Sequence, residues 1–279
     1  MKEKIKFLKI KANQIRKLII QMLAKAGSGH PGGSLSSTDI ISCLYFEVMH
    51  HNPKGPQWPE RDRFHLSKGH CCPAVYAALG LSGYFPLEEL WRLRCLGSIL
   101  QGHSDRRTPG VEVASGSLGQ GLSVAVGMAL AGKIDKKDYR VYCLMGDGEI
   151  QEGNIWEAAM SAAHFKLDNL CGIIDYNRFQ IDGKVEDIMN LEPLVKKWES
   201  FGWYVIESDG HNIEELLRAF EKAKSVKSKP TVIIAHTTKG KGVSFMENVV
   251  DFHGRAPTQQ EREKALRELE GIDRQLEGQ

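Results

Sequence analysis

The stretch Val141-Tyr142-Cys143-Leu144-Met145-Gly146-Asp147-Gly148 decides the fold of this chain of 279 residues. Five apolar residues stop at a Gly-Asp-Gly turn, which is typical of a buried β-strand with an abrupt end. A second strand pattern runs from Leu170 to Asp175 and leads to Asn177, and a helical pattern over residues 153–165 lies between the two strands. Apolar strands on either side of an amphipathic helix predict one step of a parallel sheet.

The same alternation continues through the rest of the chain. Two further strand patterns cover residues 203–206 and 231–235. Helical patterns are found at 4–24, 37–49, 73–81, 87–96, 118–130, 190–200 and 212–227. Thr258 and Glu261 form a capping-box pattern, so a polar helix is expected over residues 258–277. We therefore predict a single α/β domain over residues 1–279, with a parallel sheet and helices on both of its faces.

The composition narrows the possible functions. The net charge is +2 and the acidic and basic residues are interspersed, so nucleic acid is not an expected partner. No run of about 18 apolar residues occurs, and no membrane span is expected. None of the 6 cysteines forms a C-x-x-C pair, so we expect reduced thiols and a cytoplasmic location.

The Gly146-Asp147-Gly148 turn is the first candidate site. Ligands of an open parallel sheet bind beyond the carboxyl ends of its strands. Asp147 and Asn177 each follow a predicted strand, so both are expected at that edge. Glycine lets the backbone approach a phosphate closely, and Mg²⁺ prefers oxygen ligands supplemented by substrate phosphates. Asp147, Asn177 and a backbone carbonyl therefore predict a magnesium–diphosphate site. The alternative is a tight turn with a capping aspartate, and the pairing with Asn177 argues against it.

Histidines beside glycine in predicted loops form the second candidate site. They are His30, His70, His103 and His253. Imidazole donates to phosphate or hydroxyl oxygens and moves protons near neutral pH, although each ring alone could simply be satisfied by backbone. The other six histidines are interpreted as structural, and His211 is the most open of these because it lies in a glycine-bearing loop: His50, His51, His65, His164, His211 and His236.

The segment Ser115-Gly116-Ser117-Leu118-Gly119-Gln120-Gly121 is the third candidate. It is either a glycine-rich entry to a helix or a place of close backbone contact with a flat ring or phosphate. The residues alone leave both interpretations open.

Together these motifs resemble the N-terminal half of transketolase, a thiamine-diphosphate enzyme. The resemblance covers essentially the whole chain and rests on ordered matches at Ser28-Gly29-His30-Pro31-Gly32, Gly69-His70, Gly102-His103, Thr108-Pro109-Gly110-Val111-Glu112, Gly119-Gln120-Gly121, Gly146-Asp147-Gly148, Gln151-Glu152-Gly153 and Ile181-Asp182-Gly183. It implies the thiamine-diphosphate-binding fold, and within it the domain that holds the diphosphate.

The resemblance also implies roles for single residues. Asp147, Asn177 and the main-chain carbonyl of Phe179 would bind Mg²⁺, for which Ca²⁺ or Mn²⁺ can substitute. The residues that would bind the cofactor are His70, Gly116, Ser117, Leu118, Asp147, Gly148, Glu152, Asn177 and His253. His30, His103 and His253 would surround the reacting atoms as catalytic residues. Ser117 and Phe179 depart from the family, which usually has proline and an aliphatic residue there.

The family's pyrimidine-binding domain has no counterpart in the sequence. The resemblance therefore implies a split transketolase, in which a separate C-terminal subunit supplies that domain, and we expect an α₂β₂ heterotetramer. The expected reaction moves a two-carbon ketol unit from a ketose phosphate to an aldose phosphate, as in the pentose phosphate pathway. Rival hypotheses are a subunit of another thiamine enzyme, such as a 2-oxo-acid dehydrogenase or deoxyxylulose-phosphate synthase, and a non-enzymatic regulatory subunit.

Overall fold

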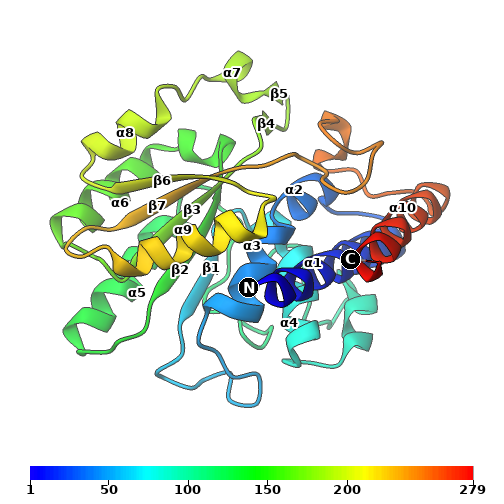
Figure 1. Ribbon diagram of the computed structural model, residues 1–279, viewed down its shortest axis with the longest axis horizontal. Helices are drawn as coiled ribbons and strands as arrows, with labels where there is room; N and C mark the ends of the chain where they lie inside the picture. The colour runs from blue at the N-terminus through cyan, green and yellow to red at the C-terminus, as the bar shows by residue number, and fades with distance from the viewer. Residues whose placement is uncertain (279) are drawn as a thin grey trace.

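A five-stranded parallel sheet forms the centre of the structure, a computed structural model that describes residues 1–278 (Figure 1). The strand order is β1-β2-β3-β7-β6 and every neighbouring pair is parallel. The strands are β1 (Arg63–Leu66), β2 (Val141–Gly146), β3 (Leu170–Tyr176), β6 (Tyr204–Asp209) and β7 (Thr231–His236). The four strands predicted from apolar runs are confirmed, as is their parallel arrangement.

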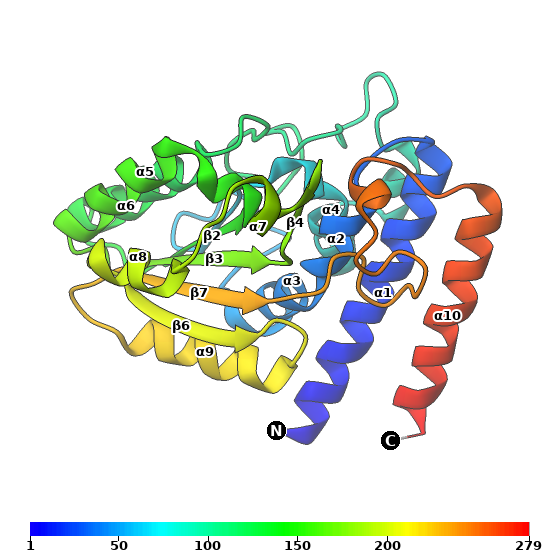
Figure 2. The ribbon, with the colours of Figure 1, turned by 90° about the horizontal axis from the view of Figure 1, so that it is seen from above.

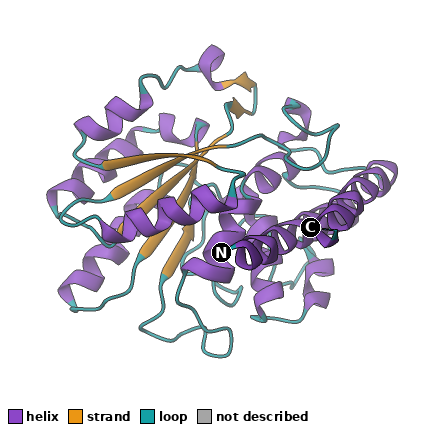
Figure 3. Ribbon diagram, viewed as in Figure 1, coloured by secondary structure: helices purple, strands orange, loops and turns teal. Residues whose placement is uncertain are grey.

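Helices cover both faces of the sheet (Figure 3). Alternate residues of β2 belong to two separate cores, with Tyr142 and Leu144 on one face and Cys143 and Met145 on the other. The first core is completed by α1 (Lys2–Ala26), α3 (Thr38–Cys43), α4 (Cys72–Ser82) and α9 (Ile213–Ser225). The second is completed by α5 (Gly121–Ile134), α6 (Gly153–His164) and α8 (Leu194–Ser200). Strands buried on both faces must be apolar throughout, which explains their uninterrupted hydrophobic runs.

The first and last helices lie side by side (Figure 2). The side chain of Asn13 in α1 donates to the carbonyl of Leu269 in α10 (Gln259–Glu277), with a distance of 2.8 Å between Nδ2 and the oxygen. Helix α10 begins at the predicted capping box, in which the Thr258 hydroxyl accepts from the Glu261 N–H and the Glu261 carboxylate accepts from the Thr258 N–H. Within residues 1–278, no helix has the length and apolar character needed to cross a membrane.

Several elements differ from the sequence prediction. The edge strand β1 was not predicted, because it is only four residues long and carries Arg63 and His65. The hairpin of β4 (Phe179–Gln180) and β5 (Gly183–Lys184) was not predicted either, since two-residue strands carry no periodicity. Residues of the first histidine loop form the short helix α2 (Pro31–Ser36), whose proline at the first turn is compatible with a helix start.

Four predicted helices have clearly different bounds. The helix predicted over 190–200 is α8, which begins only at Leu194. The helix predicted over 37–49 is α3 followed by a π-helical turn at Leu44–Val48. The helix predicted over 87–96 is a 3₁₀-helix limited to Leu87–Arg92. The helix predicted from residue 118 begins at Gly121, so the preceding glycine-rich residues remain loop. The short elements α7 (Val185–Ile188) and η5 (Val250–His253) complete the fold near the cavity described next.

The capping box gives a direct test of how α10 is held. Thr258→Ala removes the oxygen that accepts from the Glu261 N–H, so we expect the free energy of unfolding to fall by about 1 kcal/mol. Thr258→Ser keeps that oxygen and should lose less than half as much. Urea unfolding followed by circular dichroism measures both variants. Equal losses in the two would contradict the hydrogen-bonding role of the side chain.

Candidate active site

A cavity of about 310 Å³ lies at the carboxyl edge of the sheet, where β2 and β3 end. Ten of the residues predicted as site residues line it: His30, His70, His103, Gly116, Leu118, Asp147, Gly148, Asn177, Phe179 and His253. The parallel register places Gly146 beside Asp175, so the segments that follow the two strands leave the sheet together. The predicted convergence of the Gly-Asp-Gly turn and Asn177 is thus present in the structure.

Asp147 is a buried carboxylate at the end of β2, with only 2% of its surface exposed. Its Oδ1 accepts from the Gly148 N–H at 2.8 Å, and its Oδ2 accepts from the Arg178 N–H. Burial, together with the nearby negative charge of Asp175, raises the pKa of Asp147 to about 7. A cation in the cavity would stabilise its charged form.

Asn177 is held at both ends of its carboxamide. Its Nδ2 donates to Asp175 Oδ2 at 3.1 Å, while its Oδ1 accepts from the Phe179 N–H at 3.1 Å. Phe179 starts the short strand β4 and lines the same cavity. Two side-chain oxygens and a backbone carbonyl are hard ligands of the kind Mg²⁺ takes, and a diphosphate supplies the others. Among residues 1–278 no group of three or more His, Cys, Asp or Glu is placed to hold a metal ion.

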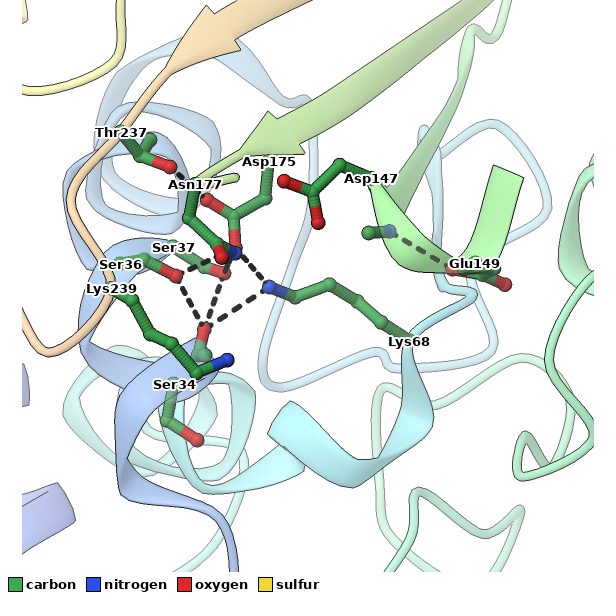
Figure 4. Close-up of polar contacts among 12 residues, drawn as sticks. Ser34, Ser36, Ser37, Lys68, Asp147, Glu149, Asp175, Asn177, Thr237 and Lys239 are labelled. Atoms are coloured by element: carbon green, nitrogen blue, oxygen red, sulfur yellow. Dashed lines mark hydrogen bonds and ion pairs between the residues drawn. The ribbon is translucent and has the colours of Figure 1, made fainter. Parts of the chain in front are cut away.

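Lys68 and Asp175 form a buried ion pair behind these ligands (Figure 4). Asp175 is fully buried and also accepts from the hydroxyls of Ser36, at 2.6 Å, and Thr237. Burial alone would raise the pKa of Asp175, but Lys68 holds the pKa below its usual range. Neither residue was predicted as a site residue from the sequence, although an acidic residue at the end of a buried strand was a usable signal.

Glu149 is a second buried acid that was not predicted. Its Oε1 accepts from the Gly119 N–H and its Oε2 accepts from the Gly146 N–H, each at 3.0 Å. It therefore connects the glycine-rich segment before α5 to the Gly146-Asp147-Gly148 turn, and it also lines the cavity.

Two predicted cofactor residues, Ser117 and Glu152, do not line the cavity. Both are exposed at its rim, and Glu152 precedes the first residue of α6. Gly116 and Leu118, on either side of Ser117, do line the cavity. The cofactor-binding roles of Ser117 and Glu152 therefore stay predictions, because neither residue lines this cavity.

The four predicted histidines gather around the cavity. Ring centroids are 5.1 Å apart for His30 and His70, 6.2 Å for His30 and His103, and 5.8 Å for His30 and His253. Burial, aided by Arg94, lowers the pKa of His30 to about 4. Burial and the neighbouring Lys239 lower the pKa of His253 to about 3, and burial also lowers the pKa of His70 and His103. The four rings are neutral near pH 7 and can each donate and accept a hydrogen bond.

Lys239 brings a buried ammonium to the cavity from the loop after β7. Only 2% of its surface is exposed, and its Nζ lies 3.1 Å from His253 Nδ1. Burial lowers its pKa, because the charged form is poorly solvated there. A neighbouring anion would offset that cost. The sequence signal was its position just beyond a third strand end on the same edge of the sheet.

Together, these features define a parallel α/β domain whose cavity combines oxygen ligands, neutral histidines and a buried ammonium for an anionic ligand. Residues 8–277 match the family described as "Transketolase, thiamine diphosphate binding domain". The chain belongs to the transketolase family.

Relatives within that family are close. A 6-deoxy-6-sulfo-D-fructose transketolase subunit from Clostridium sp. (strain MSTE9) is 50% identical, with 94% of this chain and 96% of that protein covered. An apulose-4-phosphate transketolase subunit from Phocaeicola vulgatus is 46% identical, with 95% and 94% covered. The crystal structure of Campylobacter jejuni transketolase superimposes with a TM-score of 0.89 at 40% identity, over 94% of this chain and 42% of that one.

These coverages separate two kinds of relative. The chain spans nearly the full length of the two proteins named as subunits, but less than half of the single-chain transketolase. It therefore corresponds to the N-terminal subunit of a split transketolase, a transferase of two-carbon ketol units that uses thiamine diphosphate.

The buried ion pair makes a stability prediction. Lys68→Met leaves the Asp175 carboxylate buried without its partner, so the free energy of unfolding should fall by about 3–5 kcal/mol. Lys137→Met, which breaks the exposed pair with Glu60, is the matched control and should change the free energy of unfolding far less, because solvent screens that pair. Urea unfolding compares the two. Similar losses would show that the Lys68–Asp175 pair is not a structural anchor.

The histidine cluster predicts a pH dependence. Below the ordinary pKa of 6.5 the unfolded chain takes up protons that the folded His30 and His253 do not bind. Their contribution to stability is therefore lost as pH falls from about 6.5 to about 4. Asp147 acts in the opposite direction because its pKa is raised, so single variants are compared.

Between about pH 7 and pH 5, the free energy of unfolding should fall less for His253→Gln than for the wild-type chain. Chemical unfolding of the cofactor-free protein at several pH values measures this difference. Parallel pH profiles for the two proteins would contradict the depressed pKa.

Proposed function

We propose that this chain, folded as one domain over residues 1–279, holds the diphosphate end of thiamine diphosphate together with Mg²⁺. The proposal rests on the observation that Asp147, Asn177 and Phe179 line one cavity together with four neutral histidines. A separate C-terminal chain with a pyrimidine-binding domain completes the site in an α₂β₂ heterotetramer in the cytoplasm. Relatives named as subunits of nearly equal length support the two-chain form.

The chain's own groups divide the work of binding. Asp147 Oδ, Asn177 Oδ1 and the Phe179 carbonyl hold the metal ion, with Ca²⁺ or Mn²⁺ as substitutes. His70 and Lys239 donate to the diphosphate, and the loop at Gly148 lets the backbone approach it. Gly116 and Leu118 contact the aminopyrimidine ring. Ser117 and Glu152 meet the partner's half of the site at the exposed rim.

Bound thiamine diphosphate supplies the nucleophilic carbon that takes up the two-carbon unit. His30, His103 and His253 surround the space where that carbon reacts. Because the three rings are neutral, they donate N–H groups to sugar hydroxyl and carbonyl oxygens and exchange protons with them.

The proposed substrates are sugars with an anionic end, namely a ketose phosphate as donor and an aldose phosphate as acceptor. The names of two relatives refer to apulose 4-phosphate and to 6-deoxy-6-sulfo-D-fructose, both of which carry such a group. A role in pentose phosphate metabolism is proposed from the resemblance to transketolase.

Reconstitution tests the function. The chain mixed with its cognate C-terminal subunit should transfer ketol units between sugar phosphates, while either chain alone should not. Asp147→Ala should lower the activity of the mixture at least about 100-fold, because a metal ligand is lost. Asp182→Ala, which changes an acid near the cavity to which no ligand role is assigned, is the control.

Full activity of this chain alone would contradict the two-subunit proposal. Decarboxylation of pyruvate by the mixture in place of ketol transfer would favour another thiamine enzyme. Unchanged activity of Asp147→Ala would point instead to a non-enzymatic subunit.

A further inference from the structure

The loop after β7 must keep the Lys239 ammonium inside the cavity. The peptide group that follows Lys239 is fixed, because the Gly240 N–H donates to the Gly32 carbonyl at 2.9 Å and the Asn248 N–H donates to the Lys239 carbonyl at 2.9 Å. Immediately before Lys239, the Thr238 N–H donates to the imidazole Nε2 of His211 at 2.7 Å. His211 is thus bonded to the residue that precedes the buried ammonium.

The hydrogen bonds of His211 define its tautomer. A backbone N–H can only donate, so Nε2 carries no proton and acts as the acceptor. Nδ1 therefore carries the proton and donates to Asp39 Oδ2 at 2.8 Å. The Asp39 carboxylate orients the ring through Nδ1, and Nε2 accepts the hydrogen bond from the Thr238 N–H of the loop.

Asp39 is itself held by α1. Arg16 Nη2 donates to the same Asp39 Oδ2 at 2.5 Å, and Arg16 Nε donates to the Lys241 carbonyl at 3.1 Å. The side chains of Arg16, Asp39 and His211 are at most 15% exposed. Arg16, Asp39 and His211 come from α1, α3 and the β6–α9 loop. His211 and Arg16 bind the loop after β7 at residues 238 and 241, on either side of Lys239.

We propose that His211, oriented by Asp39 and Arg16, is a positioning residue that fixes the Thr238–Lys239 turn and so keeps the Lys239 ammonium facing the cofactor's diphosphate. The inference rests on the proposed function for the identity of the anion. A buried ammonium pairs more favourably with an anion when supporting contacts hold it in the binding geometry beforehand. His211 supplies an acceptor to the Thr238 N–H, in the residue that precedes Lys239.

Three variants of the full chain separate positioning from general stability. His211→Asn keeps a donor for Asp39 but is too short to accept from Thr238, whereas His211→Gln can place its Oε1 near the position of Nε2. His236→Asn is the control, because His236 also bonds a carboxylate, Glu207, at 2.9 Å but is more exposed.

With saturating Mg²⁺, His211→Asn should bind thiamine diphosphate about tenfold more weakly by calorimetry. His211→Gln should recover part of that affinity, and His236→Asn should bind as the unchanged chain does. In a Lys239→Met background, His211→Asn should have no further effect, because the group that it positions is gone.

An undiminished effect of His211→Asn in the Lys239→Met background would overturn the proposal, as would unchanged binding by His211→Asn. If the wild-type chain binds no thiamine diphosphate alone, the same comparison is made in the complex with the C-terminal subunit, and absence of binding there means that the proposed function fails instead. Hydrogen exchange over residues 237–242 then decides the positioning role, since it needs no ligand. His211→Asn should speed exchange there and His236→Asn should not, and equal exchange in the two would overturn the inference.

Discussion

The buried ion pair between Lys68 and Asp175 is the interaction on which the rest of the site depends. It lies at the end of the central strand β3, where Asp175 also accepts from Ser36, Thr237 and Asn177. Removing two charges from water is costly, and only such a dense set of donors compensates for it. Because the donors come from α2, the loop after β7 and the loop after β1, one carboxylate fixes the segments that surround the cavity.

The electrostatics of the cavity follow from this burial. Desolvation lowers the pKa of four histidines and of Lys239, and it raises the pKa of Asp147. A metal ion beside Asp147 and a diphosphate beside Lys239 would each relieve one of these costs. The protein part of the site is therefore complementary to a ligand that carries both charges, which is what a magnesium–diphosphate unit does.

The sequence predicted those parts of the site that local pattern determines. Apolar runs stopped by Gly146 and by Asn177 locate two strand ends, and parallel strands bring their ends together. The four cavity histidines were predicted as site residues because each lies beside a glycine in a predicted loop. Lys239, Glu149 and the edge strand β1 were missed, because each owes its place to partners far along the chain. Glu149 bonds Gly119, and β1 is a strand only through its pairing with β2.

Electron paramagnetic resonance of Mn²⁺ tests the central claim most directly, because Mn²⁺ takes the same oxygen ligands as Mg²⁺. With thiamine diphosphate and the full chain, the account predicts phosphorus couplings from a diphosphate bound to the same ion. These should be lost in Asn177→Ala and kept in Asp182→Ala. Phosphorus couplings that persist in Asn177→Ala, or cofactor binding that is equally tight without any metal, would contradict the account.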